Sequence, residues 1–169
     1  KYLKPLGLLE QIVLNRYVLY GYTNKMGCMK TSTGATISRG KRLYGHMVAH
    51  PFEAMNAMMS FIWFGVFEKF PKLTVVHVEA DAGWVPYWLQ RMEQHYEFSG
   101  NAEHPDLERS PTEYFRQNVF VACRGDERTL PAAVELVGDE NLTFNTDYPH
   151  PDGTWPWGLE QIGEQPISE

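Results

Sequence analysis

Acidic residues follow two short apolar runs of this sequence, and they are the residues best suited to chemistry. Glu79 comes directly after the run 73–78, which contains His77, and Asp147 comes after the run 142–146. A carboxylate at the rim of an apolar core is costly unless it is ligated or paired. Carboxylate oxygens and imidazole nitrogens are ligands that Zn²⁺ and Mn²⁺ accept. The pattern therefore indicates a metal site or an acid–base site, without deciding between them.

The same residues also have purely structural interpretations. A lone histidine in a strand, such as His77, is more often a buried core residue than a ligand. An aspartate after a strand, such as Asp147, also starts turns. Side chains alternate along a strand, so an extended segment 77–79 places His77 and Glu79 on one side. The segment 80–83 is typical of a tight, exposed loop, which favours a functional role for Glu79.

Strands and helices alternate along the chain and position these residues. Short apolar, β-prone runs predict buried strands at 17–20, 73–78, 118–123 and 142–146. Helices are expected over 50–70, 85–98, 126–137 and from Ser110 onward. Pro51 suits the first position of a helix, and Ser110 with Glu113 forms a capping-box pattern. Residues 22–45 show no sustained period and are expected to form a long loop.

Strands separated by helices imply right-handed crossovers and a parallel sheet. Active sites of such folds lie at the carboxyl ends of the strands, where Glu79 and Asp147 are found. Typical closed (β/α)₈ barrels take about 250 residues and at least about 200. This chain has 169 residues, so its four strands fit either a small open sheet or half of a barrel.

Composition excludes several classes of protein. The formal net charge of −6 and the scattered Lys and Arg residues argue against nucleic acid as a partner. The most apolar stretch, 54–67, contains Asn56 and is too short to span a membrane. The two cysteines, Cys28 and Cys123, form no close-spaced metal motif, and a reducing cytoplasm is the default expectation.

Three segments of the chain resemble the amidohydrolase-related family. They are 65–95, with FEKFPKL and the GWVP turn, 111–127, and 141–156, with TDYPHPDGTWP. That family includes aminocarboxymuconate-semialdehyde decarboxylase and γ-resorcylate decarboxylase. The resemblance implies an α/β fold, the C-terminal part (about strands 5–8) of a (β/α)₈ TIM barrel. It also implies that 1–169 is one domain that lacks the N-terminal strands and the final helix.

The resemblance implies one divalent metal, zinc first and manganese as the alternative. Asp147 matches the family's strand-8 aspartate, a metal ligand, and therefore takes a metal and catalytic role. Glu79 matches the strand-6 position, where the decarboxylases carry His, and is expected to be a ligand or a proton carrier. Tyr20 stands near the place where the family has a strand-5 histidine.

Three more residues are candidates for contact with substrate. His150 lies between two prolines that fix its backbone, and it is expected to face substrate or the surface. Arg124 suits bidentate binding of a substrate carboxylate, with a salt bridge to Asp126 or Glu127 as the alternative. Trp84, after Gly83, is a substrate-binding candidate whose alternative role is packing.

The main functional expectation is a metal-dependent hydrolase of a small carboxylated or cyclic substrate. In it Asp147 takes the proton of water whose pKa the metal has lowered. A decarboxylase is the first alternative, and a non-catalytic half-barrel that binds a partner through the helix over 52–67 is the second. Family members are commonly dimers, so a homodimer is expected at full length. An isolated half-barrel, with open sheet edges, is expected to self-associate and to be inactive alone.

Overall fold

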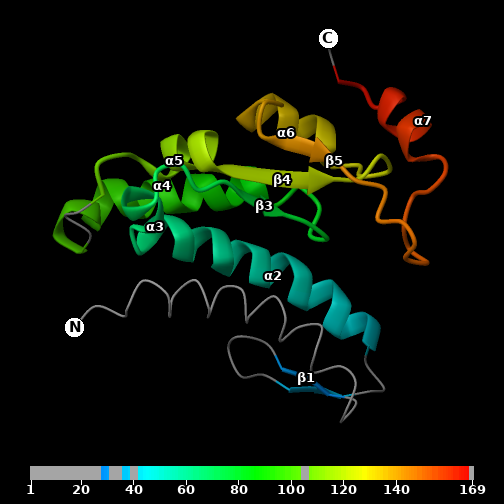
Figure 1. Cartoon of the computed structure of the whole chain (residues 1–169), viewed down its shortest axis with the longest axis horizontal. Coiled ribbons are helices and arrows are strands. Elements are labelled where there is room, and N and C mark those ends of the chain that lie inside the picture. Colours follow the sequence, from blue (N-terminus) through cyan, green and yellow to red (C-terminus); the bar gives the residue numbers. More distant parts are fainter. Residues whose placement is uncertain (1–27, 31–35, 39–41, 104–106, 168–169) are drawn as a thin grey trace. The chain divides into compact units, whose positions relative to one another are not determined.

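The computed structural model describes residues 28–30, 36–38, 42–103 and 107–167 (Figure 1). The chain divides into two compact units, residues 1–53 and 54–169, and each is described by itself. The predicted strand 17–20, which includes Tyr20, lies outside the described residues.

Two short strands and the start of a helix belong to the first unit. The strands β1 (Cys28–Lys30) and β2 (Thr36–Ser38) pair in antiparallel fashion. The helix α2 (Arg42–Trp63) begins here and continues into the second unit. The expectation of a continuous loop over 22–45 is therefore wrong at these residues, since three-residue strands carry no recognisable pattern.

The start of α2 also differs from the prediction. Pro51 lies inside the helix, not at its first position. A proline inside a helix removes one backbone hydrogen bond and crowds the preceding turn. The turn before it is nevertheless helical, and its Ala49 is fully buried. Packing of this turn outweighs the missing bond, because tertiary contacts provide most of the stability of helices in proteins.

A parallel three-stranded sheet is the centre of the second unit. Its strands are β3 (Val75–His77), β4 (Val119–Cys123) and β5 (Leu142–Phe144), in the order β3-β4-β5. Val75 pairs with Val119, and Leu142 pairs with Val121. All three arrows point the same way in Figure 1, so the three carboxyl ends share one edge. The parallel sheet and its three strands confirm the prediction, although β3 and β5 are shorter than expected.

Helices connect and flank these strands. They are α3 (Val66–Lys69), α4 (Val85–Glu103), α5 (Pro111–Asn118), α6 (Leu130–Val137) and α7 (Gly158–Gly163). The predicted capping box is confirmed: the Ser110 hydroxyl accepts from the Glu113 N–H, and the Glu113 carboxylate accepts from the Ser110 N–H. Gly138 ends α6 as expected, with φ of 85°. Within the described ranges, no helix is long and apolar enough to cross a membrane.

Aromatic side chains fill the core beside the sheet. Phe67, fully buried, stacks on Phe61 with ring centroids 5.5 Å apart and on Tyr114 at 6.4 Å. The indole N–H of Trp88 in α4 donates to the carbonyl of Met55 in α2 at 2.8 Å. These contacts join the four helices α2, α3, α4 and α5.

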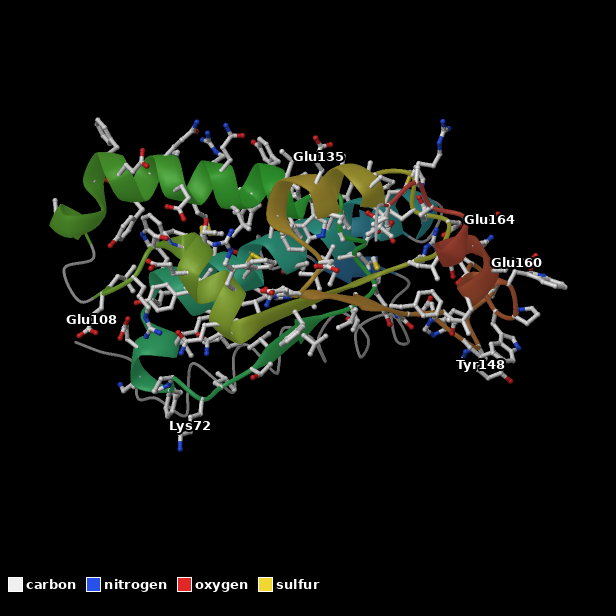
Figure 2. The ribbon with its side chains drawn as sticks, turned by 90° about the horizontal axis from the view of Figure 1, so that it is seen from above. Lys72, Glu108, Glu135, Tyr148, Glu160 and Glu164 are labelled. Atoms are coloured by element: carbon white, nitrogen blue, oxygen red, sulfur yellow. The ribbon has the colours of Figure 1, made fainter. Side chains whose placement is uncertain are left out.

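Two buried asparagines fix the amino-terminal end of the sheet. Asn118 Nδ2 donates to the carbonyls of Pro71 and Leu73, at 3.0 and 2.8 Å, just before β3. Asn141 Nδ2 donates to three carbonyls at the α5–β4 junction. In Figure 2, Lys72, just before β3, and Tyr148, beyond β5, are well separated.

Candidate metal centre

Residues at the carboxyl ends of β3 and β5 form the candidate site. The strand β3 ends at His77, and Glu79 lies two residues beyond it with φ of 65°. This left-handed conformation ends the regular alternation of side chains. The argument that His77 and Glu79 share one side of a strand is therefore wrong. His77 is buried beside Trp84, with ring centroids 6.2 Å apart in an edge-to-face contact.

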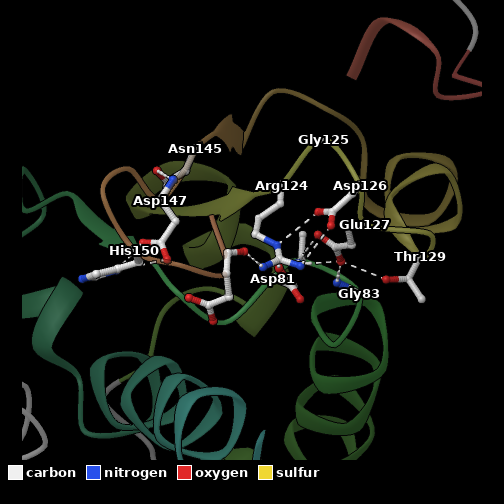
Figure 3. A network of polar contacts seen from close by, with 12 residues as sticks. Asp81, Gly83, Arg124, Gly125, Asp126, Glu127, Thr129, Asn145, Asp147 and His150 are labelled. Carbon is white, nitrogen blue, oxygen red and sulfur yellow. Dashed lines mark hydrogen bonds and ion pairs between the residues drawn. The ribbon is translucent and has the colours of Figure 1, made fainter. Parts of the chain in front are cut away.

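Glu79, Asp147 and His150 come together although they lie on two different loops. Each offers one possible metal-ligand atom, and these atoms all lie within 4.8 Å of one another. His150 Nδ1 is 3.1 Å from each carboxylate oxygen of Asp147, and Figure 3 shows the two side chains facing each other. The side chain of Asp147 is mostly buried, whereas that of His150 is exposed. The cluster is thus accessible from solvent on the histidine side.

A compact turn after β5 places Asp147 and His150 together. The Asn145 side-chain oxygen accepts from the Asp147 N–H at 2.8 Å, and the His150 N–H donates to the Asp147 carbonyl at 2.9 Å. Gly153 closes the turn by donating to the His150 carbonyl. A Cβ at Gly153 would lie 2.7 Å from the Thr146 carbonyl oxygen, so only glycine fits. The hydrogen bonds of this turn therefore hold His150 beside Asp147.

The Asp147 carboxylate changes the titration of its neighbour. It accepts a hydrogen bond from the His150 ring and attracts its positive charge, which together raise the pKa of His150 above the ordinary 6.5. Glu79 and Asp152 add smaller effects of the same sign. Because Nδ1 faces Asp147, the other ring nitrogen is the one available to exchange protons with a ligand.

Arg124 lies between three loops at this edge of the sheet (Figure 3). Its Nε is 3.2 Å from Asp126 Oδ1 and 3.5 Å from Asp81 Oδ1, and its Nη1 donates to the Asp152 carbonyl at 3.0 Å. The expected salt bridge to Asp126 is thus present. Arg124 joins the three strand-end loops and offsets part of their negative charge.

Trp84 is a packing residue in this structure. Its side chain is buried, and its indole N–H donates to the Asp81 carbonyl at 2.8 Å. It therefore holds the loop after β3 from the inside.

Glu127 contacts the loop after β3, and the sequence does not reveal this contact. Its carboxylate is buried and accepts hydrogen bonds from the backbone N–H groups of Ala82 and Gly83 and from the Thr129 hydroxyl. Burial raises the pKa of Glu127 above its usual value, and these hydrogen bonds oppose the rise. The only sequence signal is an acidic residue two positions before a threonine in the turn after β4.

The donor set fits a divalent cation. Ligand oxygens and nitrogens stand about 2.0–2.2 Å from Zn²⁺, so two ligands of one ion lie at most about 4.4 Å apart. The candidate ligand atoms of Glu79, Asp147 and His150 lie within 4.8 Å of one another. Small rotations of these side chains shorten the distances to those that one ion allows. Two carboxylates and an imidazole suit zinc and manganese alike. A cation also offsets the repulsion between the two carboxylates.

Comparison with known proteins identifies the family of this chain. The family model described as Amidohydrolase matches residues 19–167. The chain therefore belongs to the amidohydrolase family. The 2-amino-3-carboxymuconate-6-semialdehyde decarboxylase of Dictyostelium discoideum is 33% identical over 112 residues, which are 63% of this chain and 30% of that protein.

Solved structures of the superfamily have the same fold. A 5-carboxyvanillate decarboxylase from Sphingomonas paucimobilis matches with a TM-score of 0.59 and 25% identity, over 71% of this chain and 36% of that one. A dihydroxybenzoic acid decarboxylase from Polaromonas, with bound manganese and 2-nitroresorcinol, has a TM-score of 0.58 and 20% identity, over 79% and 42%. The predicted α/β fold of the amidohydrolase superfamily is confirmed. The chain spans about a third of the length of these relatives.

Proposed function

We propose that this chain carries part of the active site of a metal-assisted decarboxylase of a small carboxylated organic acid. The observation that carries the proposal is the convergence of Glu79, Asp147 and His150 at the carboxyl ends of parallel strands, where (β/α)₈ enzymes place their catalytic groups. The sequence favoured hydrolysis, with decarboxylation second. Decarboxylation now comes first because the relatives named above are decarboxylases.

Glu79 and Asp147 are the proposed metal ligands, each through a carboxylate oxygen. A divalent ion, when bound, supplies positive charge that binds and polarises substrate oxygens. Manganese and zinc are both proposed, since the donor set accepts either. Arg124 and Trp84 support the rim in this proposal. A direct contact of either with substrate remains a secondary proposal, because Arg124 already contacts Asp126 and Asp81.

His150 is the proposed proton donor. When the carbon–carbon bond to the leaving carboxylate breaks, the electron pair stays on the substrate carbon as CO₂ departs. A proton from the outer ring nitrogen of His150 then bonds to that carbon, and His150 regains a proton from water. This assignment supplies the acid that a decarboxylase with Glu79 in place of the usual histidine requires.

Several expectations from the sequence remain proposals. They are the place of β3, β4 and β5 as strands 6 to 8 of a barrel, the single domain 1–169, a homodimer at full length and a cytoplasmic location. Light scattering on the purified protein measures the oligomeric state directly, and a monomer at micromolar concentration would contradict the homodimer.

Calorimetric titration of the full-length protein with Mn²⁺ and Zn²⁺, followed by a CO₂-release assay on a panel of hydroxybenzoic acids, tests the proposed function. Asp147→Asn should remove metal binding and CO₂ release, because it removes a charged ligand from the cluster. Asp139→Asn removes an equal charge from an exposed position before β5 and should leave both unchanged. Hydrolysis of amides or lactones without CO₂ release would support the hydrolase alternative. Binding of no metal by the unaltered protein would favour the non-catalytic binding module.

A further inference from the structure

The buried carboxylate of Glu127 anchors the loop that follows β3. Its Oε1 accepts from the Gly83 N–H at 2.6 Å, from the Ala82 N–H at 2.9 Å and from the Thr129 hydroxyl at 2.8 Å. The side chain reaches this loop from the turn after β4, across 44 residues of sequence. Figure 3 shows the contacts of Glu127 with Gly83 and Thr129 on the far side of Arg124 from Asp147.

The anchored loop has a backbone that needs support. Glu79 and Asp81 have φ values of 65° and 55°, a left-handed conformation that is unfavourable for a non-glycine residue. Such a conformation persists only where the surroundings determine it. One carboxylate holds two consecutive N–H groups of this loop, and hydrogen bonds to a charged group are stronger than neutral ones. These contacts therefore help to fix the backbone conformation of the loop.

The residue at position 83 shows how closely the anchor fits. A Cβ added to Gly83 would lie 2.2 Å from Thr129 Oγ1 and 3.2 Å from Glu127 Oε1. The backbone of the loop therefore approaches Glu127 and Thr129 as closely as a glycine permits. A side chain at this position would separate the loop from its anchor.

We propose that Glu127 is a positioning residue of the metal centre, which sets the place of the Glu79 carboxylate by holding Ala82 and Gly83. This inference rests on the proposed function, since it concerns the same cluster. The described hydrogen bonds of Glu127 go to Ala82, Gly83 and Thr129, so its action on the site passes through the loop. Partners that orient metal ligands in this way typically change metal affinity by about 10–100-fold when removed.

A matched control variant distinguishes the positioning role of Glu127 from a purely stabilising one. Asn118 is equally buried and also holds backbone beside β3, but at the amino-terminal end, through the carbonyls of Pro71 and Leu73. Asn118→Leu should lower the melting temperature without moving Glu79. Glu127→Gln keeps one acceptor oxygen in place, whereas Glu127→Met fills the same volume without any acceptor.

The experiment measures Mn²⁺ affinity by calorimetry and melting temperature for the unaltered chain and these three variants. Glu127→Met should weaken Mn²⁺ binding at least about tenfold, Glu127→Gln should restore most of it, and Asn118→Leu should leave it unchanged. Wild-type affinity in Glu127→Met, or an equal loss in Asn118→Leu, would overturn the inference.

Hydrogen exchange of the peptide covering 78–84 separates this inference from the proposed function. Faster exchange there in Glu127→Met, and not in Asn118→Leu, supports the anchor whatever metal the chain binds. Unchanged exchange would overturn it. Absence of Mn²⁺ binding by the unaltered chain would instead count against the proposed function alone.

Discussion

Replacement of Gly83 by alanine tests how tightly the metal-centre loop fits against the turn after β4. The new Cβ would lie 2.2 Å from Thr129 Oγ1 and 2.7 Å from Thr129 Cβ. Carbon atoms normally approach to about 3.5–4.0 Å, so the loop and Thr129 must separate by about 1 Å. Overpacking of this kind costs about 1–3 kcal/mol. For a chain of this length each kcal/mol lowers the melting temperature by about 2–4 °C.

Thermal unfolding followed by circular dichroism measures this loss, and Mn²⁺ titration measures its effect on the site. Gly163→Ala is the matched control, because a Cβ at Gly163 has no heavy atom within 4 Å. Thr129→Gly removes the two nearest of the three atoms that the new methyl group meets and leaves Glu127 Oε1 at 3.2 Å. The double variant with Gly83→Ala should therefore be less destabilised than the sum of the two single variants, which a double-mutant cycle detects.

Two results would refute this reasoning. One is a Gly83→Ala protein that melts and binds Mn²⁺ like the unaltered chain. The other is a destabilisation that remains fully additive with Thr129→Gly, which would mean that the methyl group does not meet Thr129.

Two other predictions follow from the described contacts. In metal-free protein, the NMR titration midpoint of His150 should lie above 6.5 and return toward 6.5 in Asp147→Asn. The raised folded-state pKa means that the ion pair's stabilisation is fully present below 6.5 and is lost as the pH rises through the folded value. An unshifted His150 would contradict the ion pair. Asn141→Leu should lower the free energy of unfolding by about 1–3 kcal/mol, because three carbonyls lose the buried donor. Chemical denaturation measures this loss, and an unchanged midpoint would contradict it.

The strands could be predicted because their composition is distinctive, and several helix boundaries could not. Short apolar, β-prone runs before Glu79 and Asp147 indicated β3 and β5. The start of α6 at Leu130, not Asp126, depends on the turn in which Glu127 is engaged with the neighbouring loop. Pro51 inside α2 depends on the burial of the preceding turn. Both are tertiary effects that local patterns do not contain.

The candidate site was also predictable only in part. Its acidic members were predictable, because strand ends of a parallel sheet gather at one edge, and Glu79 and Asp147 end two such strands. The pairing of His150 with Asp147 was not predictable, since it depends on the turn that Asn145 and Gly153 close. Glu127 was missed because its partners are backbone N–H groups that any sequence offers.

The strands of the parallel sheet are staggered. Val75 of β3 is opposite Val119, whereas Leu142 of β5 is opposite Val121, so the strand starts advance by two residues from β3 to β5. The three strands therefore do not lie level with one another: β5 begins and ends two residues nearer than β3 to the carboxyl-end edge, where the candidate site lies.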